Sequence, residues 1–517
     1  MTRALQRSTA ALFFLLAAHP AAAAVRYVDV NSVNPMPPFT NWTTAAAVIQ
    51  DAVDAADPGD EVLVTNGVYA TGGRAVGTNV LVNRAAVDKP LTLRGVNGPQ
   101  FTIIQGYQVP GTTNGHGAIR CVYLANGASL SGFTLANGAT RTAGEWEREQ
   151  TGGGVACPST KAVLTNCVIV GNSAGWEGGG ASGGTLNNCT LTGNSAKYGG
   201  GAYGSTLDHC TLTSNSAEEG GGAYVCILKN CRLIGNSASW SGGGAQISTL
   251  DNCTLIANSA RSGGGAHWEV NCPINSILNN CTLTGNSAEY GGGAYGGILN
   301  NCIVYLNTAT DGPNYSRDHV TLNCSCTTPL PTNGVGNITN APLFVDYASG
   351  NLRLQSNSPC INAGLNAYAP GSTDRDGRPR IVGGTVDIGA YEFQGLDLGP
   401  FIDWLERYGL PTDGSADFAD IDADTMNNWQ EWRAGTIPTN ALSVLRLLTP
   451  VSNGTSLTVT WESVAGRSYF LECSADVSPT SAFTRIATDV VAQTNTTSFV
   501  HTNAVGASLR FYRVCVE

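Results

Sequence analysis

Through the middle of the chain, apolar and polar residues alternate in short runs that recur about every 21 residues. In each unit a Leu lies three residues before a Cys, and in most units an apolar residue follows two positions later, as in Leu186, Cys189 and Leu191. The units have no apolar stripe with a period of 3.6 residues, so the pattern predicts strands rather than helices. Because Leu186 and Cys189 can both point inward only if the chain bends between them, each unit is predicted to consist of short strands joined at Asn and Gly corners.

Seven cysteines mark this repeat, at steps of 22, 21, 21, 22, 28 and 21 residues: Cys167, Cys189, Cys210, Cys231, Cys253, Cys281 and Cys302. Most units also carry Gly-Asn-Ser-Ala or a close variant, followed by three glycines and an alanine. Self-similarity at a fixed period is typical of a solenoid, in which each unit buries its apolar face only against its neighbours. We therefore predict an all-β fold, a right-handed single-stranded parallel β-helix with coils stacked about 4.8 Å apart.

The seven repeated cysteines are predicted to form a ladder of packed, free thiols. Side chains in an in-register ladder all point the same way, and a free Cys behaves as a small apolar residue. A metal site is disfavoured because the unit has no second ligand at zinc spacing. The nine other cysteines are better candidates for disulfides, with a pairing that the sequence leaves open: Cys121, Cys157, Cys226, Cys272, Cys324, Cys326, Cys360, Cys473 and Cys515.

The segments on either side of the repeat array keep short alternating runs without its period. Residues 45–56 are an exception, since they form an amphipathic helix candidate with Ile49 and Val53 on one side. A helix at this end would cover the edge strand of the solenoid. The array is predicted to span about 152–310, and residues 342–393 to close its other end.

Three motifs lie in this closing segment: SPCINAG at 358–364, DRDGRPR at 374–380 and DIGAYE at 387–392. The segment resembles the choice-of-anchor Q domain that ends bacterial right-handed β-helix surface proteins. The repeats are similar to those of chlamydial polymorphic outer membrane proteins, although Leu stands here where those repeats have Phe. The resemblance implies a bacterial surface β-helix protein and does not imply an autotransporter.

Beyond residue 393, a run of acidic residues has the spacing of the EF-hand calcium loop. The positions match as follows: Asp420, Asp422 and Asp424 at 1, 3 and 5, the carbonyl of Met426 at 7, Asn428 at 9 and Glu431 at 12. Thr425 replaces the glycine usual at position 6, which is expected to weaken or distort the site. We predict a structural calcium ion that stiffens the link between domains. The alternative is an acidic turn that only caps the following helix.

The last segment alternates again in strand fashion and resembles a small fibronectin type III-like β-sandwich. The predicted organisation is a signal peptide at 1–24, the β-helix at 25–395, a short helical EF-hand-like connector at 396–443 and the sandwich at 444–517.

The N-terminus and the composition predict an exported protein. Arg3 and Arg7 precede a short apolar run, and Ala22–Ala24 supplies a small-residue cleavage site, with cleavage expected after Ala24. No run is long enough to cross a bilayer, so the mature chain is expected to lack a transmembrane segment. A formal net charge of -11 argues against a nucleic-acid partner. We expect a monomer that is secreted or held at the bacterial cell surface.

Acidic residues give little indication of catalysis. Those of the repeat, such as Glu177, Asp208 and Glu219, are interpreted as scattered over different positions of the unit, so no column of paired carboxylates is expected. The charged patch at 141–149 offers groups for a lyase and is equally explained as an insert loop. No catalytic residue is assigned.

Aromatic residues around the glycine block suggest a ligand. In-register stacking is expected to gather them into exposed columns, which suit sugar rings or a protein partner, although the rings could simply stack on one another. The candidate ligand-binding residues are Trp176, Tyr198, Tyr203, Tyr224, Trp240, Trp268, Tyr290 and Tyr295. We predict a non-catalytic protein that binds glycans or mediates surface adhesion. The alternative is an extracellular polysaccharide lyase or glycoside hydrolase of the pectin-lyase-like fold.

Overall fold

The computed structural model describes residues 23–269, 276–395, 399–412, 416, 419–474, 483–502 and 510–516. The chain divides into two compact units, Met1–Phe393 and Gln394–Glu517. Most of the predicted signal peptide and Cys272 lie outside the described residues.

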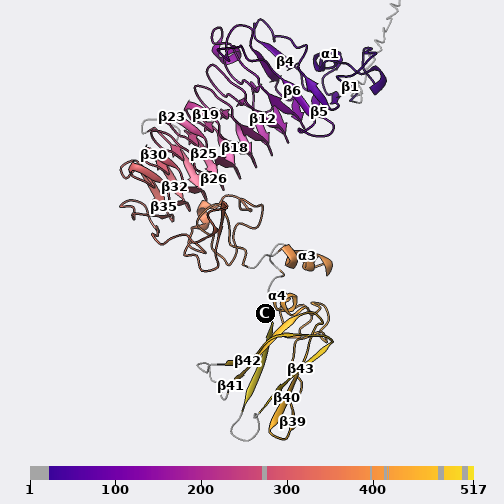
Figure 1. The fold of residues 1–517 in the computed structure, drawn as a ribbon, viewed down its shortest axis with the longest axis vertical. Coiled ribbons are helices and arrows are strands. Elements are labelled where there is room, and N and C mark those ends of the chain that lie inside the picture. The colour runs from indigo at the N-terminus through magenta and orange to yellow at the C-terminus, as the bar shows by residue number, and fades with distance from the viewer. Residues whose placement is uncertain are drawn as a thin grey trace, which may run out of the picture. The chain divides into compact units, whose positions relative to one another are not determined.

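The first unit is a right-handed parallel β-helix, as the repeat predicts. Each complete coil of the repeat array gives one short strand to each of three parallel sheets, and successive coils pair in register. The coils follow one another along the axis in chain order (Figure 1).

The sheets are named here by their number of strands. The twelve-stranded sheet comprises β1 (Val25–Val28), β2 (Glu61–Val64), β5 (Thr92–Gly95), β8 (Ser129–Ser131), β11 (Val163–Thr165), β14 (Thr185–Asn187), β17 (Thr206–Asp208), β21 (Ile227–Lys229), β25 (Thr249–Asp251), β28 (Ile277–Asn279), β32 (Gly297–Asn300) and β35 (Val320–Asn323). The nine-stranded sheet comprises β4 (Val82–Val87), β7 (Ile119–Leu124), β10 (Val155–Ala156), β13 (Ala181–Ser182), β16 (Ala202–Tyr203), β20 (Ala223–Tyr224), β24 (Ala245–Gln246), β27 (Ala266–His267) and β31 (Ala294–Tyr295). The eleven-stranded sheet comprises β3 (Gly67–Tyr69), β6 (Thr102–Gln105), β9 (Thr134–Ala136), β12 (Val168–Val170), β15 (Thr190–Thr192), β18 (Thr211–Thr213), β22 (Arg232–Ile234), β26 (Thr254–Ile256), β29 (Thr282–Thr284), β33 (Ile303–Tyr305) and β36 (Cys326–Thr327). Shorter pairs are β19 (Ser216–Glu219) with β23 (Ser237–Ser241), β30 (Ser287–Tyr290) with β34 (Thr308–Asp311), and β37 (Phe344–Asp346) with β38 (Asn351–Leu354).

The corners between strands are formed by residues with positive φ, as the Asn and Gly bends predict. Asn188, directly before Cys189, has a φ of 52°, and Gly193 and Gly199 form the next two corners with φ of 62° and 64°. The left-handed conformation at Asn188 lets both Leu186 and Cys189 face the interior, where they are buried.

All seven repeated cysteines are buried and free, as a packed thiol ladder requires. The expectation of disulfides among the other cysteines is not met, since the fifteen cysteines that the structure describes are all free. Cys226 is an example of a cysteine that belongs to the stacked coils. It occupies the same coil position as Ser248 one coil later, and its backbone N–H donates to the Ser248 Oγ at 3.1 Å. It therefore packs as a core residue, and burial raises the pKa of its thiol to about 12.

A second ladder, of buried asparagines, runs beside the thiols. Its members are the Asn of each Gly-Asn-Ser-Ala motif or variant: Asn172, Asn194, Asn215, Asn236, Asn258, Asn286 and Asn307. In Asn215, for example, the backbone N–H and the Nδ2 both donate to the Oδ1 of Asn236, at 3.0 and 2.9 Å, and Nδ2 also donates to the Leu191 carbonyl. Each amide thus ties together three consecutive coils, a role that the sequence pattern alone does not predict.

The predicted N-terminal cap is present as α1 (Ile49–Ala55), which buries Ile49 and Val53 and follows η1 (Trp42–Thr44). Residues 342–393, which include η2 (Asn366–Tyr368), pack along the side of three successive coils, whose Asn252, Asn280 and Asn301 side chains donate to backbone carbonyls of this segment. This segment buries charged groups, among them Arg380 and Glu392, whose Nη1 and Oε2 lie 3.9 Å apart.

The second unit contains α3 (Gly399–Arg407), α4 (Asn428–Ala434) and two three-stranded antiparallel sheets. One sheet comprises β39 (Val451–Asn453), β40 (Ser456–Glu462) and β43 (Thr496–His501), and the other β41 (Ser468–Ser474), β42 (Thr484–Val491) and β44 (Phe511–Val516). Trp461, Tyr469 and Leu471 are buried in their common core. Among the described residues, no helix has the length and apolar character to cross a membrane.

Candidate functional site

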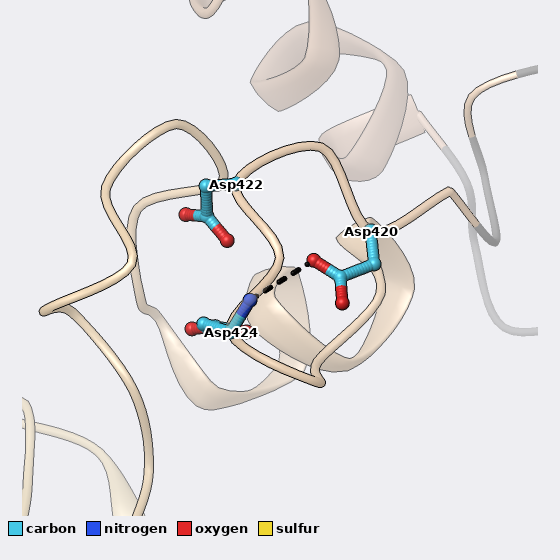
Figure 2. A group of neighbouring side chains, drawn as sticks. All are labelled: Asp420, Asp422 and Asp424. Carbon is cyan, nitrogen blue, oxygen red and sulfur yellow. Dashed lines mark hydrogen bonds between the residues drawn. The ribbon is translucent and has the colours of Figure 1, made fainter.

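The first candidate site is the acidic loop before α4. Asp420, Asp422 and Asp424 each place a carboxylate oxygen within 4.8 Å of the others (Figure 2). The Asp420 carboxylate also organises the turn, because it accepts hydrogen bonds from the backbone N–H groups of Ala423, Asp424 and Thr425 at 2.8 to 3.2 Å. The loop is therefore shaped with its acidic groups converging.

Several oxygens in this loop are buried without a hydrogen-bond partner in the described structure. They are both carboxylate oxygens of Asp422, Oδ2 of Asp424, Oδ1 of Asn428 and Oε2 of Glu431. Asn428 and Glu431 are themselves fully buried. Buried acceptors without partners are costly, so this set fits a hard cation that takes oxygen ligands, as calcium does.

The charge of the loop, the cap of α4 and the backbone turn at Thr425 agree with a cation site. Burial and the neighbouring Asp422 and Asp424 raise the pKa of Glu431 to about 7. Asn427 caps α4 in a capping box with Gln430. Thr425, where the loop pattern has glycine, adopts a φ of 81°, so the sharp turn is kept in a conformation unfavourable for Thr.

Helices α3 and α4 hold the loop through an aromatic cluster. Phe401 and Leu405 are buried, and the Phe401 ring lies 5.0 Å from that of Trp429 and 5.3 Å from that of Trp432. The loop is therefore anchored at its C-terminal end by α4.

The second candidate site is the outer side of the nine-stranded sheet, where two columns of side chains run along the coils. The pre-glycine column consists of the residue before each glycine block: Thr151, Glu177, Tyr198, Glu219, Ser241, Ser262 and Tyr290. The post-alanine column consists of the residue after each buried alanine: Ser182, Tyr203, Tyr224, Gln246, His267 and Tyr295. We refer to both together as the two-column face.

The two columns contact each other across the glycine corner. The Tyr198 ring lies 5.4 Å from that of Tyr224, and the Gln246 Nε2 donates to the Glu219 Oε2 at 3.2 Å. Within the post-alanine column, Tyr203 and Tyr224 stack with centroids 5.6 Å apart and planes within 9°. These contacts define a half-buried surface in which flat rings alternate with polar groups.

The candidate aromatic residues do not all belong to these columns. Trp176 and Trp240 lie one position before the pre-glycine column. A basic side chain lies over each ring: Lys197 Nζ is 4.2 Å from the centre of the Trp176 ring, and the Arg261 guanidinium is 5.9 Å from that of Trp240. Trp268 lies one position beyond the post-alanine column. Within the post-alanine column, Gln246 separates Tyr224 from the stacked rings of His267 and Tyr295, so the rings form groups rather than one continuous stripe.

The interpretation of the acidic residues as scattered is wrong. Glu177 and Glu219 occupy the same coil position, with Tyr198 between them, and aligning the repeat on its glycine block would have found them. Burial raises the pKa of both carboxyl groups. A hydrogen bond with Tyr203 opposes this effect at Glu177, whereas Glu269 and Glu218 add to it at Glu219.

In the charged patch at 141–149, which includes α2 (Trp146–Glu149), residues 142–148 are exposed and Glu149 is buried and paired within the fold. The Glu149 Oε2 pairs with the Arg141 Nη1 at 2.7 Å, and its Oε1 accepts from the backbone N–H of Val80 at 2.5 Å. This favours the insert-loop explanation. The loop also borders a pocket of about 270 Å³. Thr151 and Ser182, the first residues of the two columns, line this pocket, so it lies at the N-terminal end of the two-column face.

No family model matches the chain, and no curated protein matches it. Among solved structures, pectate lyase Pel9A is similar at 15% identity and a TM-score of 0.42, over 72% of this chain and 97% of that chain. A rhamnogalacturonan lyase matches at 11% identity and 0.36, over 65% and 96%. Pectin methylesterase PemA from Erwinia chrysanthemi matches at 12% and 0.31, over 62% and 94%. At these scores the likenesses say nothing about chemistry, and the choice-of-anchor Q, EF-hand and fibronectin type III resemblances stay predictions.

Proposed function

We propose that the chain is a secreted, non-catalytic β-helix protein that binds glycans on the two-column face and thereby mediates surface adhesion. The stacked pair of Tyr203 and Tyr224 is the observation that carries this proposal. Flat, half-exposed rings beside hydrogen-bonding groups suit the apolar faces of sugars. The N-terminal pattern of a signal peptide supports export.

Affinity electrophoresis of the whole protein through gels that contain a panel of neutral, acidic and amino-sugar polysaccharides tests this proposal. The double variant Y203A/Y224A should lose at least about tenfold in affinity for a retarding glycan, while Phe101→Ala, which removes an exposed ring from a turn, should bind normally. Equal retardation of both variants, or no retardation of the parent by any glycan, would overturn it.

One observation favours a second candidate function, glycoside hydrolysis. Glu177 and Glu219 are two coils apart, about 9.6 Å at the usual strand spacing, near the upper end of the carboxylate separation in inverting glycosidases. New reducing ends after incubation with the same polysaccharides, abolished by Glu219→Gln, would establish this function in place of binding alone.

We also propose that the acidic loop binds one structural calcium ion through Asp420, Asp422, Asp424, the Met426 carbonyl, Asn428 and Glu431. The buried, unpartnered oxygens of Asp422, Asn428 and Glu431 support this, because a cation would satisfy them together. An extracellular location would supply calcium at a concentration that fills even a weak site.

Calorimetric titration with calcium and thermal melting with and without a chelator test the site. Calcium should raise the melting temperature of the parent and leave that of the D422N/D424N variant unmoved. Asp403→Asn, an exposed carboxylate on α3, serves as the matched control and should respond like the parent. A parent that neither binds calcium nor shifts its melting temperature would contradict the proposal.

A further inference from the structure

The two-column face is acidic where its rings are most concentrated. Glu177 lies near Glu147, and Glu219 lies near Glu218 and Glu269, whereas Lys197 is the one cation that acts on either carboxylate in the described structure. Lys197 already lies over the Trp176 ring. A ligand that approaches the rings therefore meets net negative charge.

In the described structure the carboxylates of this face accept hydrogen bonds from neutral groups, Glu177 from Tyr203 and Glu219 from the Gln246 Nε2. In the described residues neither Glu177 nor Glu219 lies within ion-pairing distance of a Lys or Arg. The Gln246 side chain beside Glu219 is fully buried, and its Oε1 has no hydrogen-bond partner. A nearly buried carboxylate such as Glu177, a partly exposed one such as Glu219 and a buried, unpartnered amide oxygen are all stabilised by positively charged N–H donors.

On neighbouring coils, Lys and Arg side chains of the protein already lie next to aromatic rings and carboxylates. Lys197 Nζ lies 4.2 Å from the Trp176 ring and 5.3 Å from the Tyr198 ring. Arg261 lies over Trp240 while its Nε pairs with Glu289 at 3.1 Å. Rings next to carboxylates bind cations by ring attraction and charge together.

We propose that the two-column face recognises the ammonium groups of an amino-sugar polymer, with Glu177 and Glu219 as the recognising carboxylates, and that it rejects polyuronates. This inference rests on the proposed glycan binding and names its ligand class. Successive sugars of a β-1,4-linked chain turn opposite sides outward, so alternate ammonium groups face the same way. Glu177 and Glu219 lie two coils apart with Tyr198 on the coil between them, and Tyr203 and Tyr224 stack beside this column, so the spacing of the two carboxylates matches that alternation.

Calorimetry of the whole protein with three hexamers tests the inference: glucosamine, N-acetylglucosamine and galacturonic acid. The glucosamine hexamer should bind at least about tenfold more tightly than its acetylated form, the galacturonic acid hexamer should not bind, and added salt should weaken the binding. Glu219→Gln and Glu177→Gln should each lower the affinity for the glucosamine hexamer about tenfold. Asp208→Asn, the same loss of charge on the twelve-stranded sheet, should not.

The possible outcomes distinguish failure of the amino-sugar inference from failure of the proposed glycan binding. Equal affinity for the two glucosamine forms, or tighter binding of the galacturonic acid hexamer, would overturn the ligand class and leave glycan binding intact. Failure of all three hexamers and of the polysaccharide panel would overturn both. Because Glu177 is nearly buried, a melting curve accompanies each variant, and Glu219→Gln, with its partly exposed side chain, decides the matter if Glu177→Gln unfolds.

Discussion

The side-chain nitrogen of Asn215 donates to the side-chain oxygen of Asn236 at 2.9 Å, one coil further along the β-helix. The same oxygen also accepts the backbone N–H of Asn215 at 3.0 Å. One buried amide thus satisfies two donors of the coil before it, and its own donors are satisfied by its neighbours. Chains of hydrogen bonds in a dry interior strengthen one another, so this ladder ties the coils together.

Asn236→Ala should therefore destabilise the first unit by about 3 kcal/mol, because two buried donors of Asn215 lose their acceptor. Chemical denaturation followed by circular dichroism measures this loss. Asn187→Ala, on the outer side of β14, is the matched control and should change stability little. A similar small effect for both variants would show that the ladder contributes nothing beyond packing.

The ladder thiol Cys210 should resist a water-soluble thiol reagent in the native protein. Cys210 is fully buried, and its hydrogen bonds with Cys189 and Cys231, together with burial, raise the pKa of its thiol far above the usual value, so almost no Cys210 thiolate is present at neutral pH. Full reaction is expected only after unfolding in denaturant. Rapid reaction of Cys210 under native conditions, located by mass spectrometry, would argue against the packed ladder.

Thr425→Gly should tighten calcium binding about fivefold. A residue other than glycine at a φ of 81° costs roughly 1 kcal/mol, and glycine removes that cost from the ordered loop. Calcium titration of the two proteins measures the difference. Thr425→Ala should bind no more tightly than the parent, so a gain for Ala equal to that for Gly would point to a cause other than backbone strain.

The first unit should lose stability as the pH rises towards 8. Burial, with the nearby Asp387, raises the pKa of Glu392 from 4.5 to about 8, and Arg380 offsets this only in part. Below pH 4.5 the Glu392 carboxyl group is protonated in both the folded and the unfolded chain. Between pH 4.5 and about 8 it stays protonated only in the folded chain. The stabilisation is therefore complete at low pH and is lost as the pH approaches 8. Asp374 and Asp387, whose pKa values burial also raises, act in the same direction.

Melting temperatures between pH 5 and 8 measure this dependence. Glu392→Gln should flatten the curve even if it lowers every value, since an amide does not titrate. Glu145→Gln, an exposed carboxylate in the insert loop, should leave the slope unchanged. An unchanged slope in Glu392→Gln would assign the dependence to other groups.

Much of the β-helix could be predicted from the sequence because its coils are local repeats. The interval between Leu186 and Cys189 forces a bend, and the bend lies at Asn188. The role of Asn215 could not be predicted in the same way, since an Asn in a Gly-Asn-Ser-Ala motif has the composition of an exposed turn. Its burial depends on the coils stacked on either side, which no single repeat contains.

The candidate sites also differ in how far the sequence predicts them. The acidic loop follows from spacing along one segment, so its residues could be named in advance. The contact between Gln246 and Glu219 spans a coil boundary, and the cations over Trp176 and Trp240 come from the next coil, where Lys197 and Arg261 each follow the Asn-Ser-Ala motif. Such neighbours become visible only when the coils are aligned on their glycine corners.

The fixed register of the coils also bears on how this protein can change in evolution. Gain or loss of one whole repeat would keep the buried ladders continuous and would alter the length of the two-column face by about 4.8 Å. Gain of two repeats would also preserve the alternation of Glu177, Tyr198 and Glu219, whereas gain of one would shift it. Duplication in pairs would thus lengthen the face to match a longer polymer without any new fold.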